Sequence, residues 1–253
     1  MVLGATALGV FLGHRVRHLS EDLKDPFGVL QAALLGVVGL LLAFGLSLAV
    51  SRYEDRRENV VTEATAIGTT HLRAQTLAEP VRSRSLDLLA DYAENAIRIS
   101  DEVPGSTAAD AARAREELIE RELWSLAGQA LDRAPLASAP RLYVESLNET
   151  FDAETARVAA LGNRVPTAVL VLEVIGAALA LGLLAAYLAI VGRGVLAVSL
   201  ASVLVAFLLL VTADLDRPTR GMIQVPDTVL KDELASMKQR PAATAPDRAG
   251  NVD

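Results

Sequence analysis

The sequence contains no cysteine, and histidine and tryptophan are rare, with three copies and one copy. Without cysteine the chain forms no disulfide, offers no thiolate to a metal and has no thiol nucleophile. It also lacks a Walker-type phosphate loop, a nucleophile elbow and paired histidines at metal-binding spacing. We therefore predict no enzymatic activity, and no cofactor apart from the calcium ion considered below.

Basic residues are outnumbered, with 24 Lys and Arg against 31 Asp and Glu, and the formal net charge is −7. Nucleic-acid binding needs a concentrated basic surface. The sequence shows no basic patch in an aromatic or motif context. Nucleic acid is therefore not expected as a partner.

Apolar residues are abundant, at 52% of the chain, and the mean hydropathy is +0.35. This is too apolar for an ordinary soluble domain, whereas 22% charged residues is too many for a bundle that lies wholly in lipid. Most charges fall between residues 51 and 164, and the run 28–50 has none. The pattern predicts a membrane protein with a large extramembrane segment.

One continuous stretch, residues 28–70, organises the chain. Its apolar part, 28–50, holds about 23 residues, or roughly 35 Å of helix, which is enough to cross a bilayer with some tilt. No Pro or loop signal separates this run from the charged segment that follows. We predict one long helix that leaves the membrane and continues into water.

The first 13 residues are apolar and are followed at once by His14, Arg15 and Arg17. A signal peptide has the opposite order, with its basic region first. We expect a first transmembrane helix that is shallow or truncated at its start, in preference to an interfacial helix. The chain then turns between residues 19 and 27, where Pro26 is suited to the first turn of the next helix.

Amphipathic helices fill the middle segment, which has almost no strand signal. Helical spacing relates the first set of apolar positions, and Thr107 and Asp110 are placed to cap the second helix. The expected buried positions are Ser85, Leu89, Tyr92, Ala96 and Ile99, then Ile119, Leu123, Trp124, Ala127 and Leu131, then Val144, Leu147, Phe151, Val158 and Leu161. The fold class is therefore all-α, a polytopic membrane protein with about four transmembrane helices and a helical extramembrane domain.

Pro166 opens a second long apolar span, residues 165–191, and a third follows at 195–213. Only three residues separate these spans, so we expect an antiparallel hairpin. The predicted organisation is two membrane helices at 1–50, a helical cytoplasmic domain at 51–164, the hairpin at 165–213, a cytoplasmic tail at 214–240 and a disordered terminus at 241–253.

Several short motifs together resemble those of one known family. They are Arg52-Tyr53 and Arg56-Arg57, EATAIGT at 63–69, Leu72-Arg73-Ala74, Leu147-Asn148-Glu149, Arg164-Val165-Pro166, and Asp214-Leu215-Asp216-Arg217-Pro218 with Gly221. The chain resembles the bestrophin-like membrane proteins of bacteria over most of its length. It departs from the family pattern at Thr65, where Asn is usual, and in its short first span.

The resemblance implies kinship with bestrophins, which are homo-oligomeric anion channels. It implies four membrane helices, cytoplasmic termini and a helical cytoplasmic domain between the second and third helices. It also implies a calcium-binding acidic clasp near Asp214 and Asp216. Two side chains fall short of the six to eight oxygens that calcium takes, so a salt-bridge knot from Asp214, Asp216 and Arg217 to Arg56, Arg57 or Arg73 is the alternative.

Small residues recur on the long helix at Gly36, Gly39 and Gly45, beside Leu42. They are typical of close helix packing. Alternatively, several copies of the helix surround an axis, with Gly and Ala keeping the lumen open and leucines forming an apolar gate.

Arg52, Arg56 and Arg57 follow the apolar run, and two roles are open to them. They set the topology and meet lipid headgroups, or they form a basic collar that attracts anions in a ring of subunits. Glu54, Asp55 and Glu58 dilute the field of such a collar.

Glu63, Ile67 and Thr70 share one face of the same helix. They form either a narrow cytoplasmic constriction or part of a packed core in which Glu63 pairs with Arg73 or an arginine of the tail. Glu173 lies about eight residues into an apolar span, where an ionised carboxylate is costly. It is a candidate for ion or proton handling, or a hydrogen-bonded residue at a helix interface.

Together with the resemblance, these observations favour a homo-oligomeric, anion-conducting channel whose pore is lined by residues 28–70. The resemblance implies a pentamer as the first expectation, with a tetramer as the alternative. More arginines flank the spans on the side of the middle domain, which places that domain and both termini in the cytoplasm of a bacterial inner membrane. The expected partners are lipid, inorganic anions and other copies of the chain. The rivals are a non-conducting scaffold or signalling protein and a proton-coupled transporter that uses Glu173.

Overall fold

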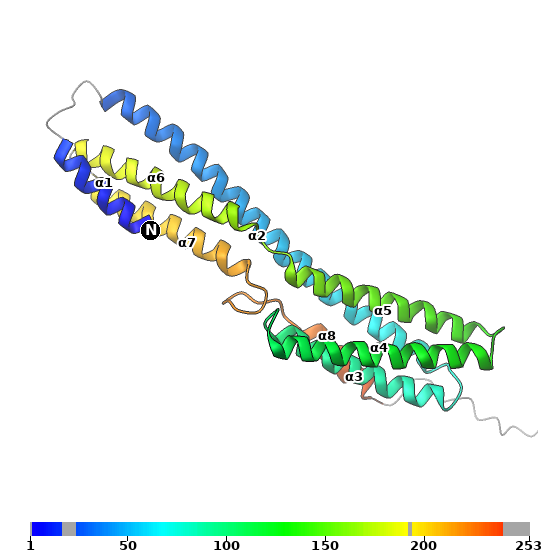
Figure 1. Cartoon of the computed structure of the whole chain (residues 1–253). Coiled ribbons are helices and arrows are strands. Elements are labelled where there is room, and N and C mark those ends of the chain that lie inside the picture. Colours follow the sequence, from blue (N-terminus) through cyan, green and yellow to red (C-terminus); the bar gives the residue numbers. More distant parts are fainter. Residues whose placement is uncertain (1, 17–23, 192–193, 240–253) are drawn as a thin grey trace, which may run out of the picture. The chain divides into compact units, whose positions relative to one another are not determined.

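The computed structural model of the chain describes residues 2–16, 24–191 and 194–239, and all regular structure within these ranges is helical (Figure 1). The helices are α1 (Val2–Val16), α2 (Lys24–Ala74), α3 (Val81–Asp101), α4 (Thr107–Arg133), α5 (Ser138–Gly162), α6 (Thr167–Val191), α7 (Val195–Leu215) and α8 (Thr228–Met237). The all-α fold class is confirmed. Arg17, most of the expected turn at 19–27, the link at 192–193 and the terminus at 241–253 lie outside the described residues.

The chain divides into two compact units. Unit 1 holds residues 1–53, 164–217 and 221–223, and unit 2 holds 54–163, 218–220 and 224–253. The predicted boundaries at 50 and 164 lie close to these, but α8 belongs with the middle helices and packs against α3. The helix α2 contributes its first part to unit 1 and its second part to unit 2.

In unit 1, α6 packs against both α1 and α7. Its buried apolar core joins α2 and α6 through Val38, Leu42, Ala177, Ala180 and Leu181, and partly buried residues of α7, among them Val205, pack against this core. The helix α1 approaches α6 closely because α1 has glycines on the face that contacts α6. A Cβ at Gly13 of α1 would lie 2.5 Å from the Ala186 carbonyl oxygen of α6. A hydrogen bond of 3.0 Å between the hydroxyls of Thr6 and Ser202 joins α1 to α7.

Three helical stretches are long and apolar enough to cross a membrane, Pro26–Ala74, Ser138–Val191 and Leu196–Leu215. Their apolar parts fall in α2, α6 and α7. The helix α1 has 15 residues, fewer than the roughly 20 that a crossing helix needs. Where the sequence predicts about four membrane helices, the described residues provide three full-length candidates and one short helix packed against them.

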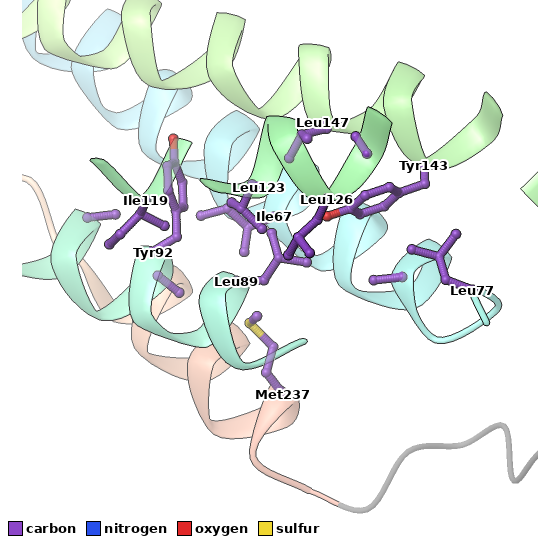
Figure 2. Packing of buried hydrophobic residues seen from close by; sticks show 14 of the residues in the cluster. Ile67, Leu77, Leu89, Tyr92, Ile119, Leu123, Leu126, Tyr143, Leu147 and Met237 are labelled. Atoms are coloured by element: carbon purple, nitrogen blue, oxygen red, sulfur yellow. The ribbon is translucent and has the colours of Figure 1, made fainter. Parts of the chain in front are cut away.

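Unit 2 has a larger apolar core, built from α2, α3, α4, α5 and α8 (Figure 2). Five large side chains of this core are 0% exposed: Ile67, Leu89, Tyr92, Leu123 and Leu147. The predicted buried positions on α3 are confirmed. On α4 the prediction is wrong at Trp124, which is 47% exposed with its ring centroid 6.4 Å from that of Phe151, and Leu131 is only partly buried. Of the positions predicted on α5, Leu147 is buried, and the others, Val144, Phe151, Val158 and Leu161, are partly buried.

The start of α4 also differs from the prediction. The side chain of Ser106, not Thr107, caps the helix, and its Oγ accepts a hydrogen bond of 3.1 Å from the Ala109 amide. The capping position precedes the first helical residue, and Thr107 already has helical geometry. Asp110 lies in the first turn, where its charge suits the helix dipole.

Candidate functional site

The helix α2 has two faces that differ sharply in burial. One face is covered by the rest of the chain. On the opposite face, exposed positions recur every three or four residues from Gly36 to Thr65, and Leu72 follows two turns later. We call the exposed set the outer stripe; it consists of Gly36, Leu40, Ala43, Ser47, Val50, Glu54, Glu58, Val61, Thr65 and Leu72. Because this spacing follows the helical repeat, these positions share one face.

The four predicted lumen positions fall on different faces of α2. Gly36 and Gly39 are exposed, and a Cβ added to either glycine would meet nothing within 4 Å. Leu42 is 7% exposed and packs in the core with α6, and Gly45 faces Glu173 of α6. Only the two exposed glycines are therefore accessible on the surface of the subunit.

The proposed basic collar is also divided by burial. Arg57 is exposed and its Nη1 lies 3.6 Å from Glu54 Oε2. Arg52 is half-buried. Arg56 is only 2% exposed and lines a small cavity of about 20 Å³ together with Ser100, Arg157 and Asp227. The expectation of a collar formed by all three arginines is corrected, because the guanidinium of Arg56 is turned into unit 2.

Glu63 and Arg157 form an ion pair inside unit 2. The two side chains are 0% and 1% exposed, and Arg157 Nη2 also donates a hydrogen bond of 3.3 Å to Glu63 Oε1. Arg157 Nη1 donates to Ser100 Oγ at 3.2 Å. The expected pairing of Glu63 with Arg73 is wrong, since Arg73 donates instead to the Leu142 carbonyl at 2.8 Å.

A second buried carboxyl group lies near this pair. Glu116 of α4 is 2% exposed, and neither of its carboxyl oxygens has a hydrogen-bond partner among the described residues. Burial, followed by the charge of Glu154, raises the pKa of Glu116 to about 9, against the opposing effect of Arg157. Burial likewise raises the pKa of Glu120, one turn along, to about 7. One arginine thus faces several carboxyl groups.

Ile67 and Thr70, predicted at a constriction or in a core, are both 0% exposed and lie inside unit 2. Ile67 belongs to the apolar core. The Thr70 hydroxyl donates to the Ser146 carbonyl at 2.8 Å and lies 2.8 Å from the Thr150 hydroxyl. Within a single copy of the chain, Glu63, Ile67 and Thr70 are packing residues.

Glu173 lies on α6 against α2. It is 2% exposed, and neither carboxyl oxygen has a hydrogen-bond partner in the described part of the chain. A Cβ at Gly45 would overlap the carboxyl group, with Glu173 Cδ only 2.5 Å away. The glycine therefore makes the space that this acid occupies.

Asp214 and Asp216 bind backbone amides at the end of α7. Both oxygens of Asp214 accept from the Met222 amide at 3.0 Å, and Oδ2 accepts from the Ile223 amide at 2.9 Å. Asp216 Oδ1 accepts from the Val165 amide at 2.6 Å. Arg217 is exposed. Of the arginines proposed for a salt-bridge knot, Arg57 pairs with Glu54, and Arg73 lies 3.9 Å from Glu145.

Within the described ranges no three His, Asp or Glu side chains are grouped so as to hold a metal ion. The residues that sequence reasoning missed are the outer stripe, Arg157 and Glu116. The stripe has a helical repeat that is readable in the sequence, but nothing in that repeat distinguishes the exposed face. Arg157 and Glu116 carry no signal beyond their presence on amphipathic helices.

Comparison with solved structures finds the same fold. A bacterial bestrophin homolog from Klebsiella pneumoniae matches with a TM-score of 0.68 at 16% identity, covering 95% of this chain and 100% of that one. A mutant of that homolog matches with a TM-score of 0.69 at 14% identity, covering 94% and 100% of the two chains. At these identities the likeness concerns the fold. No curated protein matches the sequence.

The family model named Bestrophin-like domain matches residues 1–230. This match covers most of the chain, including α1 to α7, the outer stripe and the Asp214 loop. It agrees with the motifs in the sequence and with the shared fold of the Klebsiella pneumoniae homolog. The chain therefore belongs to the bestrophin-like family.

Proposed function

We propose that the protein is a homo-oligomeric ion channel in which copies of α2 surround the pore and turn their outer stripes toward it. One observation carries this proposal: the exposed positions of α2 recur from Gly36 to Leu72, while the opposite face packs within the chain's own units. The family and the fold support a channel. A pentamer is the first expectation and a tetramer is the alternative.

The extramembrane part of α2 supports self-association. Val61 is 42% exposed and Leu72 is 59% exposed, although both lie beyond the apolar run that crosses the membrane. Apolar side chains left in water at regular spacing are typical of a face that another protein surface covers. Another copy of α2 offers such a surface by symmetry.

The decisive experiment is ion flux through purified protein in liposomes. We expect Ser47→Trp, in the apolar part of the outer stripe, to abolish most of the flux because a bulky ring would fill the pore. Leu200→Trp is the matched control, since Leu200 is 63% exposed and belongs to α7, which contributes no residue to the stripe. Equal flux in these two variants and the original protein would refute the proposed pore wall.

The proposed permeant ion is an anion, attracted by Arg52 and Arg57. The burial of Arg56 weakens this argument, and the exposure of Glu54 and Glu58 on the outer stripe favours cation conduction as a second candidate. Reversal potentials in a potassium chloride gradient distinguish the two. If the channel conducts anions, we expect Arg57→Gln to shift the reversal potential toward the equilibrium potential of potassium. If it conducts cations, we expect Glu58→Gln to shift the reversal potential toward the equilibrium potential of chloride.

The rival functions are tested in the same preparation. We propose a bacterial inner-membrane location with unit 2 and both termini in the cytoplasm, as the arginines beside the spans indicate. A proton-coupled transporter would show exchange that depends on pH and is lost in Glu173→Gln. A scaffold would give no flux under any condition.

We propose no cofactor, and expect calcium chelation to leave the flux unchanged because both Asp214 oxygens accept backbone hydrogen bonds.

A further inference from the structure

The loop that follows α7 is held back against the end of that helix. The carboxylate of Asp214, in the last turn of α7, accepts hydrogen bonds from the Met222 and Ile223 amides at 2.9 to 3.0 Å. The Arg217 amide donates to the Asp214 carbonyl at 3.0 Å. Residues that are eight and nine positions further along the chain are thereby fixed beside the end of a membrane helix.

Gly221 allows this close approach. A Cβ at this position would lie 2.8 Å from Asp214 Oδ1 and 3.1 Å from its Cγ, so a larger residue would push the loop away from the carboxylate. The carboxylate is used for holding the loop, and the ion-channel proposal assigns this loop no role.

The side chains at the turn of this loop are apolar and face away from the protein. Met222 is 80% exposed and Ile223 is 38% exposed. Their backbone amides are tied to Asp214, so the loop cannot fold these side chains inward without breaking those hydrogen bonds. Arg217, at the start of the loop, is also exposed.

The length of α7 sets the depth of the loop in the membrane. Its 21 residues rise about 31 Å, close to the thickness of the hydrocarbon core. A loop tied to the last turn therefore lies at the boundary between acyl chains and headgroups. That region accommodates apolar side chains with their backbone in water, and a long basic side chain reaches from there to phosphate.

We propose that Arg217, Met222 and Ile223, all in unit 1, dock into the membrane interface. Met222 and Ile223 enter the outer part of the acyl region, and the Arg217 guanidinium binds a lipid phosphate. The occupant of this surface is the bilayer, because the surface continues directly from a membrane-spanning helix and combines apolar with basic groups. This inference goes beyond the channel proposal and does not depend on whether the protein conducts ions.

The absence of native cysteine allows a direct test in the full chain. Met222→Cys provides a single attachment point for a fluorescent label, and Leu136→Cys is the matched control, 92% exposed between α4 and α5 in unit 2. Both proteins are reconstituted into vesicles of phosphatidylcholine and phosphatidylglycerol. Quenching is measured with a nitroxide carried on lipid acyl chains and with aqueous iodide.

We expect lipid-borne quenching to be severalfold stronger for the label at position 222 than at position 136, and iodide quenching to be severalfold weaker. Equal behaviour at the two positions would place the loop in water and overturn the proposal. Protection from both quenchers would overturn it too, because it would show that another protein surface covers the loop.

The arginine contact has its own measurement. We expect Arg217→Gln to reduce lipid-borne quenching at position 222 in vesicles that contain phosphatidylglycerol, and the reduction to be smaller in pure phosphatidylcholine. An unchanged signal in both vesicle types would overturn the phosphate contact. The oligomeric state by size-exclusion chromatography confirms that each labelled variant is folded.

Discussion

At the scale of single residues, more carboxyl groups than arginines lie around Arg157 in the interior of unit 2. Arg157 pairs with Glu63, yet Glu116 is also buried and Glu120 and Glu154 lie near it. Removing one partner of a buried ion pair leaves an uncompensated charge, which costs on the order of 3 to 5 kcal/mol. A single arginine does not balance all of these acids as ions, so protonation of Glu116 stabilises the fold.

The protonation of Glu116 makes unit 2 more stable at low pH. Its pKa is about 9 in the folded protein against an ordinary value of 4.5, so the folded state binds more protons between these values. The contribution of this group is complete below about pH 4.5 and is lost as the pH rises toward 9. Glu120 acts in the same direction up to about pH 7.

We therefore expect the unfolding temperature of the protein to fall as the pH is raised from 6 to 9. Glu116→Gln keeps the shape of the side chain without an ionisable group, and the decline should become shallower. Glu117→Gln is the control, because Glu117 is the neighbouring residue and is 67% exposed. Identical pH profiles for the original protein and Glu116→Gln would contradict the assignment.

Gly45 and Glu173 form a second residue pair that stability measurements can test. We expect Gly45→Ala to lower the unfolding temperature, because the new methyl group overlaps the Glu173 carboxyl group and overpacking typically costs about 1 to 3 kcal/mol. Glu173→Ala should restore much of the loss in the double variant. Gly36→Ala is the control, since open space surrounds that glycine. Additive effects of the two substitutions would show that the groups do not touch.

At the scale of elements, α1 is attached to unit 1 through small residues. Gly9 and Gly13 face α6, whereas a Cβ at Gly4 would meet nothing within 4 Å. The short helix has too few residues to cross the bilayer, so its position depends on this packing.

Substitution of a glycine on the packed face should separate α1 from α6. We expect Gly13→Val to lower the unfolding temperature in detergent, because its Cβ would lie 2.5 Å from the Ala186 carbonyl oxygen and 2.7 Å from the Ala189 Cβ. Gly4→Val introduces the same β-branched residue into the same helix and should have a small effect. Similar losses in both variants would contradict the packing explanation, because open space surrounds Gly4 and valine has a better helix propensity than glycine.

At the scale of the whole molecule, the outer stripe predicts how copies of the chain meet. We expect Val61→Cys, which gives each chain a single thiol, to form covalent dimers with a short bismaleimide, because the proposed channel brings the α2 helices to a common axis. Leu118→Cys is the control, being 61% exposed on α4. The products are counted on a denaturing gel. Cross-linking at Leu118 alone would place another face at the subunit contact and reject a central α2.

The sequence predicts the fold class well because its strongest patterns are long. A run of about 23 apolar residues admits few structures other than a membrane helix, and α2 continues through the charged segment as expected. The buried positions of α3 follow the helical repeat for the same reason. The cap of α4 differs by one residue, because Ser106 and Thr107 are both good capping residues and the sequence does not decide between them.

The candidate site was less accessible to sequence reasoning. Glu63 is singled out from the sequence, but its partner Arg157 is 94 residues away and comes from α5. Arg56 and Arg57 are adjacent and chemically equivalent, yet one is 2% exposed and the other is open to solvent. No local pattern distinguishes such neighbours, because their burial depends on which helices pack against α2.

The sequence by itself determined that this protein is a membrane-inserted, all-helical chain of the bestrophin-like type, because apolar run length, helical repeat and short motifs are local properties. Only the tertiary structure decided which face of α2 is free. Its repeat places Leu42, Arg56 and Ile67 toward its own subunit and Ser47, Glu58 and Thr65 outward. A helical repeat defines faces but not their surroundings, and those are set by contacts between residues far apart in the chain.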